Sequence, residues 1–260
     1  MRDNKGFATD FEGLIKNKQN ANAIWLNKLK NGETNPDKID NLKRNITSNI
    51  IKICIAKYSY GYEIPLLIPD LLSAINLCNE SWINNGWKLK LGKDQVFNQY
   101  ILSAYDEMLW MLSLGYLLNI ENEDFKKLVD VIDRDGVRDI LFEKIIKAKL
   151  TNRDLIKDES YRTHLDIPRI FNKLRKAISV STSAEAETLI KEFIRKDWYN
   201  NHKGTGWANS HKSGHNGYFG YWSFETAALV VILNLNDEAF ALSKYYPKDL
   251  VSFYKTNKLD

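Results

Sequence analysis

The sequence contains few of the residues that interrupt helices or cross-link a chain. It has five prolines and thirteen glycines among 260 residues, which leaves long stretches free to form helices. It has two cysteines, Cys54 and Cys78, and both fall within apolar patterns of helical spacing. We therefore expect a helical protein with buried free thiols rather than one held together by disulfides.

Long apolar runs are also absent. The longest run, Met108–Leu118, has eleven residues interrupted by Ser113 and Gly115, whereas a membrane span needs roughly twenty. Residues 1–13 contain no apolar segment of the kind found in a secretion signal. We expect a cytoplasmic protein that does not bind a membrane, in which Met108–Leu118 is part of a buried helix.

Strong charge of one sign is the third absence. The net charge is +4, which lacks the large, clustered excess of a dedicated nucleic-acid-binding protein. No direct nucleic-acid partner is expected. Hydrophobic residues make up 44% of the chain, enough to bury a sizeable core as one domain or as two closely packed ones.

Apolar residues recur with helical spacing through most of the chain. One long expected helix covers residues 94–118, and a basic amphipathic helix covers 168–178, with Arg175 on its solvent side. Alternation long enough for a strand is not found. The pattern predicts an all-α protein of two closely packed helical subdomains, residues 1–134 and 135–260.

The most distinctive stretch is His215–Leu235, with the sequence HNGYFGYWSFETAALVVILNL. It opens with glycines and aromatic residues and continues into an apolar segment, which is typical of a helix in the middle of a bundle. Ser223 is expected to cap this helix, which places Glu225 in the first turn. Trp222 is expected on a buried face at the start of the same helix.

This stretch resembles the C-terminal domain of PoNi proteins, and Tyr58-Ser59-Tyr60-Gly61 resembles their N-terminal domain. The C-terminal signature residues are Tyr218, Gly220, Tyr221, Trp222, Ser223, Glu225, Tyr246 and Pro247. The resemblance implies an immunity protein that binds and neutralises a PoNe-type antibacterial DNase toxin, often one delivered by a type VI secretion system. It implies no catalysis and no cofactor, and the cognate toxin is the expected partner.

Acidic residues are concentrated in Glu121–Glu143, which carries a net charge of −4. The partner-binding candidates in this segment are Glu121, Glu123, Asp124, Asp130, Asp133, Asp135 and Asp139, and Glu143 is a further acid. The segment is either a solvated helix face or a surface for the basic cleft of a DNase. The apolar spacing directs Glu123, Asp130 and Asp133 outward, and Asp135 is also expected to be exposed.

Catalytic candidates are few. His202, His211 and His215 lie in one polar loop, and the last two have the spacing of metal ligands on a helix. Neighbouring glycines argue against that helix, so we favour ordinary loop side chains without a metal. Glu225 is either a general base or a structural carboxylate, and the second interpretation is favoured. A His-dependent metal nuclease and a nucleic-acid-binding helical protein remain the alternatives.

Overall fold

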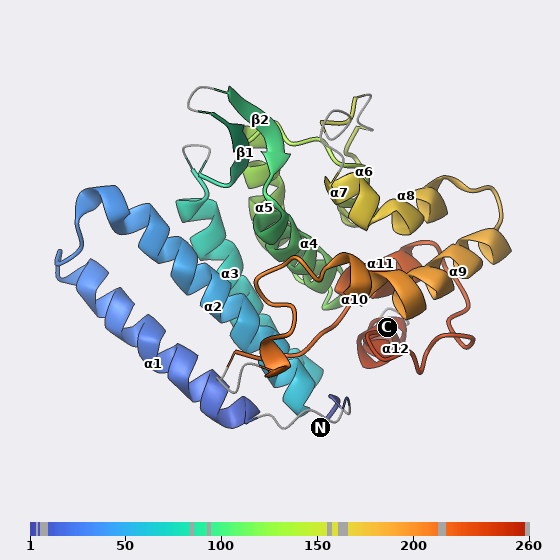
Figure 1. The fold of residues 1–260 in the computed structure, drawn as a ribbon, viewed down its shortest axis with the longest axis horizontal. Helices are drawn as coiled ribbons and strands as arrows, with labels where there is room; N and C mark the ends of the chain where they lie inside the picture. Colours follow the sequence, from blue (N-terminus) through green and yellow to red (C-terminus); the bar gives the residue numbers. More distant parts are fainter. Residues whose placement is uncertain are drawn as a thin grey trace.

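A computed structural model describes residues 1–3, 5, 10–83, 86–92, 95–154, 158–160, 166–212 and 217–257. Most of these residues lie in helices, and the strands among them form one two-stranded sheet (Figure 1). The prediction of a helical protein whose halves pack closely together is confirmed. Within the described residues no helix is both long enough and apolar enough to cross a membrane.

Two long helices that lie side by side begin the N-terminal half (Figure 1). They are α1 (Phe11–Lys30) and α2 (Ile39–Tyr60), joined through the short 3-10 turn Pro36–Lys38. Helix α2 ends at Gly61, whose φ of 112° is left-handed and therefore suits glycine. A 3-10 turn, Ile64–Leu67, leads into α3 (Ile68–Ser81), which packs against α2.

A β-hairpin occupies the region where the sequence predicted the start of a long helix. Strand β1 (Lys88–Leu91) pairs antiparallel with β2 (Gln95–Tyr100), and α4 begins only at Leu102. No strand was predicted in this region, and this small sheet is an addition to the predicted helical fold. Strands this short carry too little alternation to be distinguished from a helix by periodicity. At the base of the hairpin, Tyr100 packs edge-on against Trp82, with ring centroids 5.4 Å apart.

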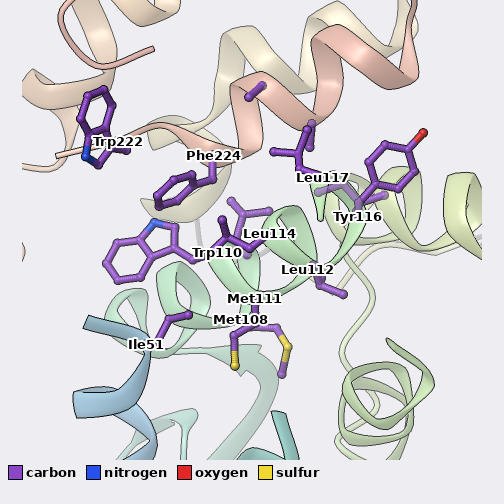
Figure 2. Packing of buried hydrophobic residues seen from close by; sticks show 14 of the residues in the cluster. Ile51, Met108, Trp110, Met111, Leu112, Leu114, Tyr116, Leu117, Trp222 and Phe224 are labelled. Atoms are coloured by element: carbon purple, nitrogen blue, oxygen red, sulfur yellow. The ribbon is translucent and has the colours of Figure 1, made fainter. Parts of the chain in front are cut away.

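Helix α4 (Leu102–Leu117) is the core shared by both halves of the chain. Every residue from Ala104 to Leu117 is buried, as expected for a helix that is apolar on nearly all sides. It contacts α3 and α5 (Asn122–Arg134) from the N-terminal half. From the C-terminal half it contacts α6 (Ile140–Lys149), α11 (Phe224–Ile232) and α12 (Lys248–Asn257). Figure 2 shows Trp110 and Leu114 of α4 beside Phe224.

The remaining C-terminal helices form a layer beside this core (Figure 1). They are α7 (Asp166–Ile170), α8 (Asn172–Ser179) and α9 (Ser183–Glu192). Helix α9 continues through the π-helical turn Phe193–Asp197 into α10 (Trp198–Asn201), and a 3-10 turn, Ser210–Lys212, follows. Cys54 and Cys78 are buried free thiols, as predicted.

Candidate functional site

The acidic segment divides into an outward-facing group and an inward-facing group. Glu121, Glu123 and Asp130 are exposed on or next to α5, as their spacing predicted for the last two. Asp124 is half-buried, and its carboxylate accepts a hydrogen bond from Lys127 at 2.7 Å. Within the described part of the chain, Glu123 and Asp130 have no ion-pair partner. These two carboxylates are therefore available to a partner.

The second half of the segment is occupied by internal contacts. Asp133 is exposed as predicted, but it pairs with Arg153 at 2.7 Å, and this hydrogen bond lowers the pKa of Asp133. The prediction that Asp135 is exposed was wrong. Its side chain is buried and accepts a hydrogen bond from the Tyr100 hydroxyl at 2.8 Å. Glu143 is also buried, 2.7 Å from Arg153.

Asp139 is wholly internal, so it does not belong to a free surface. It caps α6 by accepting the backbone N–H groups of Leu141 and Phe142 at 2.9 and 3.1 Å. It also accepts the Tyr105 hydroxyl at 2.9 Å and Arg175 Nη1 at 2.7 Å. The expectation that Arg175 faces solvent was wrong, because its guanidinium is largely buried against Asp139. Asp139 is best explained as a structural residue.

The end of α2 meets the aromatic segment before α11, and we call this contact the junction. It consists of Tyr58, Ser59, Phe219, Gly220 and Trp222. Ser59 Oγ lies 2.9 Å from the Phe219 carbonyl oxygen and accepts a hydrogen bond from Trp222 Nε1 at 2.8 Å. Gly220 has a φ of +107°, and a Cβ on it would stand 1.9 Å from Ser59 Oγ. Only glycine fits at this position.

The junction also surrounds Trp222 with buried groups. The Tyr58 ring meets it edge-on at 5.1 Å, and the Lys5 ammonium lies 3.4 Å from its ring centroid. Burial lowers the pKa of Lys5 to about 8. Trp222 is buried as predicted, but it precedes α11 instead of lying in its first turn. All the predicted signature residues are buried, namely Tyr218, Gly220, Tyr221, Trp222, Ser223, Glu225, Tyr246 and Pro247.

Both sides of the junction lie in regions that match one family. Residues 10–130 match the family described as PoNe immunity protein (PoNi), N-terminal, and residues 137–250 match PoNe immunity proteins (PoNi), C-terminal. The chain belongs to the PoNi family. It is therefore an immunity protein of the kind that acts against a toxin. Comparison with the curated proteins and with the solved structures gives no match.

In this PoNi protein, Glu225 lies in the first turn of α11, as predicted, within a buried polar cluster. Its Oε1 accepts hydrogen bonds from Trp198 Nε1 at 2.7 Å and from Ser223 Oγ at 2.5 Å. Burial raises the pKa of Glu225 to about 6. Ser223 occupies the cap position, but its hydroxyl contacts Glu225 and Thr226 instead of a backbone N–H, so the predicted capping bond was wrong.

His202 supplies positive charge to the same cluster. Its Nδ1 lies 2.5 Å from the Trp198 carbonyl oxygen and its Nε2 lies 3.6 Å from Asp106. Burial by itself lowers the pKa of His202, but the charge and hydrogen bond of Asp106 outweigh it and raise the pKa overall. Both ring nitrogens therefore face acceptors, which favours a protonated imidazole with a structural role.

The other loop histidines differ in how they are placed. His211 lies in a 3-10 turn, with Nδ1 2.9 Å from the Tyr221 hydroxyl. His215 lies outside the described residues. In the part of the chain that the structure describes, no three His, Cys, Asp or Glu side chains come together in a way that could hold a metal ion.

The buried cluster makes stability depend on pH. The folded pKa of Glu225, about 6, exceeds its ordinary value of 4.5, so its stabilising contribution is complete below pH 4.5 and lost as pH rises through 6. The pKa of His202 is raised above 6.5, so the contribution of His202 to stability is lost as pH rises through its folded pKa. As pH rises from about 4 to 7, the loss of the Glu225 proton is expected to lower the unfolding free energy by about 2 kcal/mol.

Urea denaturation across that range checks this prediction. The Glu225→Gln variant keeps an acceptor for Trp198 but cannot titrate, so its stability is expected to fall less steeply with pH than that of the wild type. Stability curves of equal slope for the two proteins would contradict the raised pKa.

Proposed function

We propose that this PoNi protein binds the nuclease domain of a PoNe-type DNase toxin in the cytoplasm and blocks it by forming a stable complex. It acts as an inhibitor and catalyses no reaction. The observation that supports this proposal is the match of both halves of the chain, residues 10–130 and 137–250, to domains of PoNe immunity proteins. A complex of this kind would bury about 1,200–2,000 Å².

The outward-facing acids of α5 provide one surface suited to such a partner. A DNase needs positive charge to hold the DNA backbone, so its DNA-binding cleft attracts carboxylates. Glu123 and Asp130 are exposed and have no ion-pair partner among the described residues. Each exposed ion pair adds little net affinity, but complementary charge on the two proteins speeds association and fixes the orientation of docking.

Inhibition is tested directly with purified proteins. An equimolar amount of this protein is expected to stop the toxin's nuclease domain from degrading supercoiled plasmid DNA, because the complex covers or distorts the active site. Agarose-gel electrophoresis measures the loss of intact plasmid. Degradation that continues at the same rate with the immunity protein in excess would contradict the proposal.

The role of α5 is tested by reversing its free charges. The Glu123→Lys, Asp130→Lys double variant is expected to associate with the toxin about tenfold more slowly at low salt, and its association rate should depend less on salt. The control is Glu63→Lys, Glu238→Lys, which makes the same change in charge at exposed residues outside α5. Stopped-flow fluorescence measures both rates, and equal slowing in the two double variants would argue against docking on α5.

A further inference from the structure

A cleft of about 550 Å³ opens where α1, α2 and α4 meet the loop after α10. It is lined by Lys18 of α1, by Lys52 of α2, by Ser103, Glu107 and Trp110 of α4, and by residues 206–210, Gly217 and Phe219. We call it the Glu107 cleft. Ser103 and Asn209 are exposed at its rim, so the cleft is accessible from solvent.

Glu107 is buried in this cleft with half of its carboxylate unsatisfied. The Ser48 hydroxyl donates to Oε1 at 2.5 Å, which fixes the side chain. Oε2 is shielded from solvent and has no hydrogen-bond partner within the described part of the chain. Leaving such an oxygen unpaired is unfavourable. The charge of Arg44 acts on this carboxylate, and Arg44 Nε is likewise buried without a hydrogen-bond partner, so no donor among the described residues satisfies Oε2.

Positive charge gathers beside this carboxylate. Lys52 Nζ donates to Ser48 Oγ at 2.9 Å, and Lys18 Nζ donates to Asn49 Oδ1 at 3.0 Å. Burial and the nearby charge of Lys52 lower the pKa of Lys18 to about 8. Neither ammonium forms an ion pair with a carboxylate in the described residues. The rim of the cleft therefore suits one negative group.

Aromatic side chains form the rest of the surface. Trp110 and Phe219 are buried with ring centroids 6.0 Å apart, and the half-buried Trp207 lies 6.1 Å from Trp110. Trp207 Nε1–H donates a hydrogen bond to Asp106 at 3.1 Å. Trp207 therefore presents its ring to the cleft but no free hydrogen-bond donor. Of these three rings, Trp207 is the one with exposed area, and an exposed ring face can accept another aromatic ring.

We propose that the Glu107 cleft receives an aromatic side chain of the toxin, a tyrosine or tryptophan that stands next to an acidic residue. The ring packs against the half-buried Trp207, its O–H or N–H is directed toward Glu107 Oε2, and the neighbouring carboxylate pairs with Lys18. This inference rests on the proposed function, since it takes the toxin as the partner. Tyrosine and tryptophan are also the residues that most often dominate binding energy at interfaces.

The charges argue against other occupants. An arginine would satisfy Glu107 Oε2 but would add a cation beside Lys18 and Lys52. A single-stranded nucleic acid would stack on the rings and contact the lysines, yet its repeated phosphates would approach the Glu107 carboxylate. One aromatic donor with one acidic neighbour satisfies the carboxylate, the ammonium groups and the rings together.

Binding of a catalytically inactive PoNe-type DNase domain tests the inference by biolayer interferometry. Ser103→Trp fills the cleft from its exposed rim and is expected to weaken binding at least about 30-fold, mainly through faster dissociation. Ser252→Trp is the matched control, because Ser252 is an exposed helical serine outside the cleft, and it should bind like the wild type. Glu107→Gln is expected to weaken binding about tenfold.

A photocrosslinking residue at position 103 gives a second readout, expected to attach to an aromatic segment of the toxin that mass spectrometry identifies. Circular dichroism establishes that each variant is folded. Failure of the wild type to bind the toxin would overturn the proposed function. Wild-type affinity in folded Ser103→Trp, with no crosslink from position 103, would overturn the cleft inference alone. Binding of a DNA oligonucleotide that Ser103→Trp abolishes while toxin binding is unchanged would also overturn it.

Discussion

Replacing Trp222 by alanine is expected to lower the free energy of unfolding by about 3–5 kcal/mol, the usual loss for a buried large aromatic side chain. The ring fills space against Tyr58 at 5.1 Å and lies under the Lys5 ammonium at 3.4 Å. Its removal also withdraws the Nε1–H that Ser59 Oγ accepts at 2.8 Å. The variant therefore loses apolar burial, a cation–π contact and a buried hydrogen bond together.

Urea denaturation followed by far-ultraviolet circular dichroism measures this effect. Trp222→Phe is the matched variant, because it keeps a ring between the same neighbours and loses the hydrogen bond to Ser59. Trp222→Phe is expected to lower the free energy of unfolding less than Trp222→Ala does, because the phenyl ring retains part of the packing. An alanine variant as stable as the wild type would show that Trp222 does not hold the junction together.

The substitution Asp139→Ala is expected to be about as damaging, at about 3–5 kcal/mol, because it leaves Arg175 with one fewer buried counter-charge. Asp139 is fully buried and accepts four hydrogen bonds, two from the start of α6 and one each from Tyr105 and Arg175. The variant loses the cap of α6 as well as the ion pair.

A double-mutant cycle separates the ion pair from the cap. Arg175→Met removes the charge but keeps much of the side-chain volume, so adding it to Asp139→Ala should cost much less than it costs in the wild type. Asp130→Ala on the exposed face of α5 is the control and should change stability by less than about 0.5 kcal/mol. Strict additivity of the two single substitutions would show that Asp139 and Arg175 are not coupled.

The acidic segment shows how far periodicity predicts a site. The apolar spacing of α5 correctly directed Glu123, Asp130 and Asp133 outward, because a helix face is a local property. The apolar spacing did not predict that Asp135 and Asp139 are buried. Their partners, Tyr100 and Tyr105, lie 35 and 34 residues away in sequence, and contacts between distant residues leave no periodic signal.

The Glu107 cleft was not predicted either, for the same reason. Its residues come from α1, α2, α4 and the loop after α10, and only the tertiary fold brings them together. One local signal was present. Asp106 and Glu107 stand directly before the apolar run Met108–Leu118, within a helix that is buried from Ala104 to Leu117. Two adjacent acids on such a helix indicate either internal partners, as Asp106 has, or a binding site.

The contact between Ser59 and Gly220 has a consequence for how such proteins diversify. A side chain at position 220 would collide with the Ser59 hydroxyl. The two halves of the chain can therefore pack together only when residues 59 and 220 are compatible. A chimera of two related proteins, joined between the matched regions 10–130 and 137–250, is expected to fold only when its residues 59 and 220 are compatible. We therefore expect inherited variation to be rare at Ser59 and Gly220 and to concentrate on exposed positions, such as the outer face of α5, where a substitution does not disturb this contact.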